Sequence, residues 1–154
     1  MTHLTELQKF FANAAENAMR IFNESGEVVP MWHAEPKEGP HLLIATPWSN
    51  DEEKHLAEKT LRLVFADHQV KRYAFISEVW MAQVKSFDEV NSGPRPSEHP
   101  DRREALLITA EDRYGNRISG NFYILRPEHG PAKLSPLDMH DHDAQTGRFS
   151  GMLR

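Results

Sequence analysis

The chain of 154 residues contains no cysteine, which excludes disulfide bonds, a thiolate nucleophile and zinc sites built on cysteine. It also has no apolar run that approaches the roughly 18 residues needed to span a membrane. Its first residues lack the basic stretch followed by an apolar stretch that marks a secretory signal peptide. We therefore expect a cytoplasmic protein with no membrane partner.

Positive charge is scarce as well. The chain carries 18 Lys and Arg against 23 Asp and Glu, which gives a formal net charge of −5. Its adjacent basic pairs, Lys71-Arg72 and Arg102-Arg103, do not extend into longer runs. Because proteins that bind nucleic acid usually present a basic patch, nucleic acid is an unexpected partner.

Signals for a bound cofactor or a serine nucleophile are missing too. Gly115 and Gly120 fall in a predicted hairpin and not before a helix, so they do not form a phosphate-binding loop. No Gly-x-Ser-x-Gly elbow occurs in the sequence. We expect no cofactor.

The clearest structural signal is the stretch from Tyr73 to Ala82. Its only polar residues are Ser77 and Glu78, and both alternating faces are apolar. A strand with one wet face would alternate between apolar and polar residues. This stretch is therefore predicted to be a central strand that is covered on both sides.

An amphipathic helix is predicted over residues 5–23, because apolar side chains recur there at three- and four-residue steps. Thr2 or Thr5 can cap its start. Gly26 stands where a C-cap glycine belongs. We expect this helix to pack on its own sheet, with partner binding as the alternative.

A second helix is predicted to run from Ser49-Asn50 to about residue 67 or 68. Either Ser49 with Glu52 or Asn50 with Glu53 has capping-box spacing. The acidic residues in its first turn suit the helix dipole better than a metal site. The stripe of this helix that we expect to be buried consists of Leu56, Ala57, Thr60, Leu61, Val64 and Phe65.

Four further strands are predicted, in two hairpins. Residues 27–35 and 41–47 form the first, and Pro30 should place its strand at an edge or at a bulge, since proline cannot donate to the ladder. Residues 104–112 and 117–125 form the second around a turn at 114–116. The fold class is therefore α+β, in the order α-β-β-α-β-β-β. One mainly antiparallel five-stranded sheet and two packed helices make up a single domain, residues 1–125.

Two long segments show no regular pattern. Residues 85–103 contain three prolines, and a loop of this length is usually either functional or disordered. Residues 126–154 contain further breaks at Pro127, Gly130, Pro131 and Pro136. We interpret this C-terminal stretch as a disordered tail or as an extended arm on a surface, and an arm that crosses to a second subunit is the alternative.

The region from Tyr73 to Asp112 carries a weak family resemblance. Glu78-Val79-Trp80 ends an aromatic strand, and Pro100-Asp101-Arg102-Arg103-Glu104 leads into an aliphatic strand that closes with Ala110-Glu111-Asp112. This combination resembles an uncharacterised family of bacterial and phage proteins. The resemblance implies a prophage or mobile-element setting and no particular activity.

One histidine pattern lies in the C-terminal stretch. His140-Asp141-His142, followed by seven residues and then Ser150, is similar to the His-x-His-x7-Ser signature of JAMM-type zinc isopeptidases. Leu153 occupies the position of that family's metal-ligating Asp, and zinc needs three rigidly held ligands. We favour a solvated histidine-rich tail, with incidental metal binding by His140, His142 and Asp143 as the alternative.

Glu78 is the strongest candidate for a catalytic residue. A carboxylate inside an apolar strand is partly desolvated, which raises its pKa and suits a general acid or base. The alternative is a structural pair with an arginine, or a strand end that emerges into water. With Glu104 or Asp112 at neighbouring strand ends, Glu78 could also hold magnesium or manganese.

The candidate binding residues are Trp48, Trp80 and the run Arg102-Arg103-Glu104. Trp48 stands at a strand-to-helix junction, where its ring could line a pocket or close the core. The absence of a coherent catalytic set favours a non-enzymatic interaction domain that binds a protein partner or itself, as a homodimer. A metal-dependent hydrolase and a small-ligand-binding domain near Trp48 and Trp80 are the alternative hypotheses.

Overall fold

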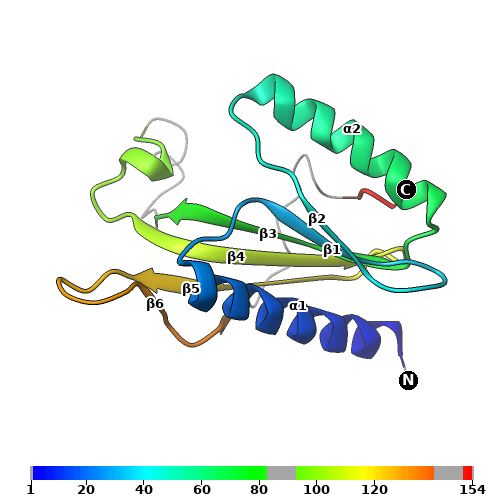
Figure 1. The fold of residues 1–154 in the computed structure, drawn as a ribbon, viewed down its shortest axis with the longest axis horizontal. Coiled ribbons are helices and arrows are strands. Elements are labelled where there is room, and N and C mark those ends of the chain that lie inside the picture. Colours follow the sequence, from blue (N-terminus) through cyan, green and yellow to red (C-terminus); the bar gives the residue numbers. More distant parts are fainter. Residues whose placement is uncertain (1, 83–92, 141–150, 154) are drawn as a thin grey trace.

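The computed structural model describes residues 2–82, 93–140 and 151–153. In these residues, two helices pack on opposite faces of one antiparallel sheet (Figure 1). The helices are α1 (His3–Ser25) and α2 (Asp51–Asp67). Neither is both long and apolar enough to cross a membrane.

The sheet contains seven strands in the described residues, in the order β2-β1-β3-β4-β5-β6, and β7 also pairs with β5. Every pairing is antiparallel. A short 3-10 helix, η1 (Pro96–Glu98), precedes β4. The strands are β1 (Met31–Glu35), β2 (Leu42–Ala45), β3 (Arg72–Met81), β4 (Arg103–Asp112), β5 (Arg117–Leu125), β6 (Lys133–Leu134) and β7 (Asp138–Met139).

The α+β class and the antiparallel sheet are confirmed, but the predicted number of five strands is wrong. The two extra strands come from the stretch after Leu125, where no periodicity was visible. Each has only two residues, which is too short to show alternation. Their backbone groups pair with the outer edge of β5, so part of the C-terminal stretch belongs to the sheet.

β3 lies inside the sheet, between β1 and β4, as its two apolar faces predicted. Ala74 and Ile76 are buried on the α1 side, and Tyr73 is buried on the α2 side. Near the C-terminal end of β3 the strand is no longer covered by other elements, and Trp80 is 42% exposed there. The centre of the predicted strand is therefore shielded, and its last residues are not.

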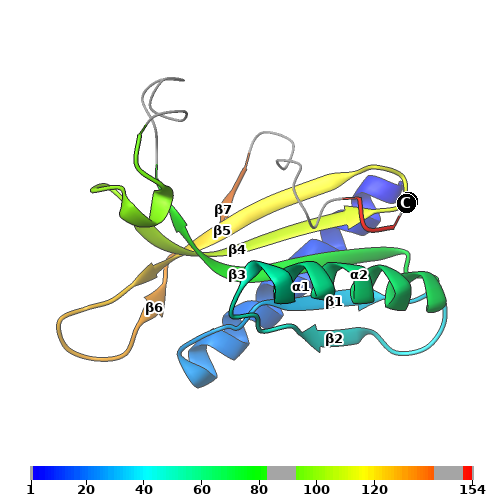
Figure 2. The same cartoon turned by 90° about the horizontal axis from the view of Figure 1, so that it is seen from above.

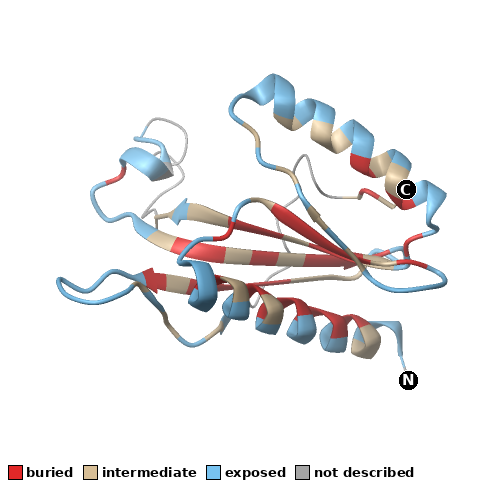
Figure 3. Ribbon diagram, in the orientation of Figure 1, coloured by how far each residue is buried: buried red, intermediate tan, exposed pale blue. Residues whose placement is uncertain are grey.

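The α1 face holds the larger core (Figure 3). Thr2 caps the start of α1 by accepting a hydrogen bond from the Thr5 amide, and Gly26 ends it with φ 81°. The close approach of α1 to β5 requires Gly120, because a Cβ there would lie 3.1 Å from Phe11. Buried helix residues include Leu7, Phe10, Phe11, Ala14, Ala18 and Phe22.

The α2 face holds a smaller core around Trp32, Phe65 and Tyr73. Seen from above, α2 lies over the β1 and β3 part of the sheet and not over β5 (Figure 2). Asn50 is the N-cap, and its side chain accepts a hydrogen bond from the Glu53 amide. The predicted buried stripe of α2 is partly wrong. Leu61 and Phe65 are buried, but Leu56 is 64% exposed, because helical geometry places it on the opposite side of α2 from Phe65. Met152, from the C-terminal stretch, is 2% exposed and completes this core.

The first hairpin is confirmed, with β1 and β2 paired from Met31 to Ala45. The predicted position of its first strand is wrong. β1 is an internal strand, flanked by β2 and β3, and it carries no bulge in this pairing. Pro30 lies just before the first strand residue, so the sheet does not require the backbone N–H that proline lacks.

Candidate functional site

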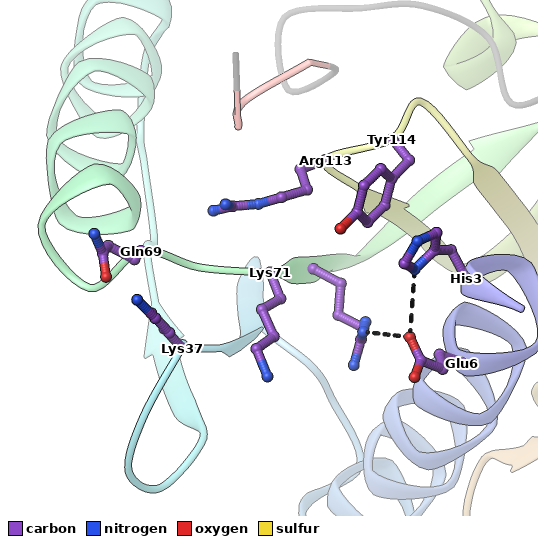
Figure 4. A pocket seen from close by; sticks show the side chains of 8 residues that line it. His3, Glu6, Lys37, Gln69, Lys71, Arg113 and Tyr114 are labelled. Carbon is purple, nitrogen blue, oxygen red and sulfur yellow. Dashed lines mark hydrogen bonds and ion pairs between the residues drawn. The ribbon is translucent and has the colours of Figure 1, made fainter. Parts of the chain in front are cut away.

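A cavity of about 420 Å³ lies at the end of the sheet where α1 begins (Figure 4). It is formed where β1 ends, β3 begins and the β4–β5 hairpin turns. We call it the end pocket. Its lining consists of His3, Glu6, Lys37, Gln69, Lys71, Arg72, Arg113 and Tyr114.

Each part of the end pocket comes from a segment with a structural reason to be there. The first turn of α1 supplies His3 and Glu6. Lys37 follows β1, and its amide donates to the His68 carbonyl at the end of α2. Lys71 precedes β3, and its amide donates to the Glu35 carbonyl. These backbone hydrogen bonds fix the positions from which the two lysine side chains extend.

The pocket is strongly cationic although the whole chain is acidic. Four of its eight lining residues are Lys or Arg, and one is Glu. Within the described residues, Lys37, Lys71 and Arg113 form no ion pair with a carboxylate. Figure 4 shows these three side chains coming from three different segments around the pocket, with their charged ends pointing in different directions. Like charges gathered in this way repel one another, so an anion in that space would relieve the repulsion.

Arg72 forms the fixed part of the pocket wall. Its two terminal nitrogens contact Glu35 and, at 3.2 Å, Glu6. Its Nε is buried and has no hydrogen-bond partner in the described part of the chain. Glu6 also lies 3.6 Å from His3. Arg72 is therefore held in place by two carboxylates, whereas the neighbouring lysines are not.

A pair of histidines continues this network into the core. His41 Nε2 lies 3.4 Å from Glu35, and His41 Nδ1 is 2.8 Å from His33 Nε2. The rings of both histidines pack against Phe10. Burial, together with the neighbouring His41, lowers the pKa of His33 to about 4. His33 is therefore neutral at physiological pH.

The lowered pKa of His33 predicts that acid weakens the fold. The unfolded chain takes up this proton near pH 6.5 and the folded chain only near pH 4, so the unfolded state binds more protons between these values. The free energy of unfolding should fall through this window by at most about 1.4 kcal/mol per pH unit. The free energy of unfolding can be measured with urea at several pH values. Its dependence on pH should be weaker in His33→Leu than in the parent chain and unchanged in the exposed control His55→Leu. Equal slopes in all three chains would exclude this assignment.

Gln69 is the one non-glycine residue with positive φ among the described residues, at 50°. Residues other than Gly, Asn and Asp rarely adopt this left-handed conformation, which costs on the order of 1 kcal/mol. Gln69 sits between α2 and β3 and lines the end pocket. Backbone strain of this kind gathers at binding sites, so it is a second reason to examine this pocket.

The end pocket can bind an anion but shows no catalytic set. Lysine and arginine are the side chains that recognise phosphate and carboxylate oxygens. The amino-terminal end of α1 adds a partial positive charge in the same region. No group of three or more His, Cys, Asp or Glu residues that could hold a metal ion occurs in the described ranges. The arrangement is therefore suited to electrostatic binding of an oxyanion.

The predicted catalytic residue Glu78 lies elsewhere. It accepts a hydrogen bond from the Val28 amide at 2.6 Å, and it stands opposite Leu106 in the sheet. Glu104 contacts Arg126, and Asp112 accepts bonds from the Tyr114 and Asn116 amides. Asp112 thus lies at the opposite end of β4, whereas Glu78 and Glu104 are diagonal neighbours on one face of the sheet. Each of the three carboxylates has its own structural partner.

The predicted binding residues are divided between two places. Trp48 stacks on Phe75 and lies under the Lys54 ammonium group. Trp80 lies at the other end of β3, beneath the Arg102 guanidinium. Arg102, Arg103 and Glu104 line a shared groove at that end of the sheet. Trp48 and Trp80 therefore do not face one pocket, but Trp80 and the Arg102-Arg103-Glu104 run do come together.

The candidate metal ligands in the C-terminal stretch can be placed only in part. His140 Nδ1 is 2.8 Å from the Ser119 hydroxyl, and His140 Nε2 is 2.8 Å from Asn121 Oδ1. Both contacts hold the end of β7 against β5. His142 and Asp143 lie outside the described residues, as do residues 85–92 of the predicted long loop over residues 85–103. His140 is thus engaged within the sheet.

Comparison of the chain with protein-family models, with curated proteins and with solved structures found no match. The implied relationship to bacterial and phage proteins therefore stays a prediction. The geometry of the end pocket is the basis on which a function can be proposed.

Proposed function

We propose that this chain is a non-enzymatic binding domain whose end pocket holds a small, multiply charged oxyanion. The observation that supports the proposal is that Lys37, Lys71 and Arg113 line one cavity and that none of them is paired with a carboxylate in the described residues. Cations without a carboxylate partner in a cavity of about 420 Å³ favour a ligand with phosphate or carboxylate groups.

The size and the charge of the end pocket limit the class of ligand that can fit it. The lining consists of charged and polar side chains and includes no aliphatic residue, so it suits a polar ligand better than a hydrophobic one. Tyr114 stacks on His3 at 3.8 Å and closes one side of the cavity. Inorganic phosphate, pyrophosphate, citrate and nucleoside phosphates are suitable probes, since they differ in charge and in size.

Thermal unfolding with these probes tests the proposal. A ligand present at about 100 times its Kd stabilises the folded chain by roughly 2.7 kcal/mol, which raises the Tm of a domain of this size by about 5–10 °C. We expect at least one oxyanion to do this at low ionic strength, and we expect added salt to reduce the effect. If no oxyanion in the panel raises the Tm, the proposal fails.

Self-association is a second proposal, supported by the position of β2. This strand ends the strand order, so its outer edge pairs with no other strand in the described residues. Leu43 on β2 is 54% exposed. Two such edges could join in antiparallel fashion into one continuous sheet, which is a frequent way for strands to associate.

Light scattering on the intact chain tests this association. We expect a mass of two chains, and we expect Leu43→Lys to give the mass of one, because a lysine on an edge strand opposes pairing. The exposed residue Leu63 on α2 provides a control, since Leu63→Lys should leave the dimer intact. A single-chain mass for the parent protein would remove the proposal.

A further inference from the structure

A second cationic surface lies at the opposite end of the sheet from the end pocket (Figure 1). There the end of β3, the start of β4 and the end of β5 meet beside β6. They form a groove of about 550 Å³, which we call the Arg-rich groove. Its basic lining residues are Arg102, Arg103, Arg126 and Lys133.

The charge of the groove is largely uncompensated. Glu104 is the one acidic residue in its lining, and it is already paired with Arg126, at 2.7 Å. In the described part of the chain, Arg102, Arg103 and Lys133 form no ion pair with a carboxylate. Among the residues that the structure describes, a chain with a net charge of −5 thus places three cations without a carboxylate partner around one groove. This favours an acidic ligand.

Two of these cations are held in position by aromatic rings. The Arg102 guanidinium lies 5.1 Å from the centre of the Trp80 ring, and the Arg103 guanidinium lies 3.7 Å from the centre of the Tyr123 ring. Such stacking holds a guanidinium while leaving its N–H groups available for a carboxylate. It also covers one face of each ring, which disfavours the stacking of nucleic-acid bases there.

The groove differs from the end pocket in its apolar component. Ile124, Leu125 and Pro127 contribute to its lining, and Leu125 is 44% exposed. A small inorganic anion would leave this aliphatic surface uncovered. A peptide that carries both carboxylates and a branched aliphatic side chain would satisfy the arginines and also cover the apolar surface.

We propose that the Arg-rich groove binds an acidic, leucine-containing segment of a partner protein. The arginines receive the carboxylates, and the aliphatic side chain packs on Leu125 and Pro127. This proposal does not depend on the end pocket, since the two sites share no residue and lie at opposite ends of the sheet.

Fluorescence anisotropy with a defined probe tests this inference. The probe is a labelled peptide of sequence Asp-Glu-Leu-Asp-Glu-Leu, and its comparison forms carry Asn and Gln in place of the acids or Ala in place of Leu. We expect the full-length chain to bind the acidic peptide with a Kd below about 1 mM at low salt, and both comparison peptides about tenfold or more weakly. The variant Arg102→Glu/Arg103→Glu should also lose about tenfold or more.

The controls separate this site from general electrostatics and from the end pocket. Lys9→Glu/Lys59→Glu changes the net charge equally on exposed helix positions, and it should bind the peptide like the parent chain. Lys37→Ala/Lys71→Ala should bind the peptide normally too. The proposal is overturned if the acidic peptide does not bind, if the Arg102→Glu/Arg103→Glu variant binds it as the parent does, or if the Lys37→Ala/Lys71→Ala variant loses it. Tighter binding of a single-stranded oligothymidine of equal length would point to nucleic acid instead and would likewise overturn it.

Discussion

Replacing both Lys37 and Lys71 by alanine is expected to weaken binding of the best oxyanion about thirtyfold, because each lysine supplies roughly 1 kcal/mol of charge-assisted hydrogen bonding. Isothermal titration calorimetry at low ionic strength measures this change. The unliganded variant should be as stable as the parent chain or slightly more stable. Both lysines are exposed, and their removal relieves repulsion among like charges.

The matched control for this experiment is Lys9→Ala/Lys59→Ala, which removes the same charge from exposed positions on α1 and α2. It should bind the oxyanion within a factor of about two of the parent chain, since neither residue lines the end pocket and a charge without direct contact to the ligand contributes little in water. Equal losses of affinity in the two double variants would show that binding depends on net charge and not on the end pocket.

Replacing Glu111 by alanine is expected to lower the free energy of unfolding by about 3–5 kcal/mol, which is the usual cost of removing one partner from a buried ion pair. Glu111 lies on the α2 face with a side chain that is 5% exposed, and it pairs with Arg117. It also accepts hydrogen bonds from the Tyr73 hydroxyl and, at 2.9 Å, from the Gly151 amide. Burial and this carboxylate together raise the pKa of Tyr73. The substitution therefore leaves a guanidinium, a phenol and an amide without their acceptor.

Urea unfolding measures this loss, and β4 offers a control with the same chemistry. Glu104→Ala breaks the ion pair with Arg126, whose side chain is 54% exposed, so it should cost no more than about 1 kcal/mol. A loss of the same size at both positions would contradict the view that the buried contacts of Glu111 with Arg117, Tyr73 and the Gly151 amide hold the C-terminal stretch on the domain.

The parts of the fold that could be predicted are those coded by local pattern. Residues 73–82 alternate between two apolar faces, and β3 is indeed internal. Thr2 and Gly26 carry the chemistry of helix ends, and α1 begins and ends at them. Such signals lie within a few residues of one another in the sequence, so they can be recognised without knowledge of the tertiary structure.

The parts that could not be predicted depend on contacts between distant residues. Met152 and Leu153 are two apolar residues in a stretch without periodicity, and only the space left between α2 and the sheet explains the burial of Met152. Leu56 is exposed because it lies on the side of α2 opposite Phe65, and the sequence alone does not show which side of the helix faces the sheet. β6 and β7 follow from the free edge of β5 and not from any propensity of their own.

The two candidate sites also differ in whether their residues are close in sequence or are brought together only by the fold. The end pocket combines α1, the turn after β1, the approach to β3 and the β4–β5 turn, so no single stretch carries its signature. Its only visible trace was the Lys71-Arg72 pair. The Arg-rich groove was easier to anticipate, because Arg102, Arg103 and Glu104 are adjacent in the chain and sheet pairing places Trp80 opposite Glu104.

Mapping the amide chemical shifts of the chain by NMR during a titration with pyrophosphate tests the central claim most directly. The proposed function predicts saturable shifts that centre on Lys37, Gln69, Lys71 and Tyr114, together with much smaller changes around Arg102 and Arg103. Shifts that centre on the Arg-rich groove, or small changes spread over all exposed lysines without saturation, would contradict it.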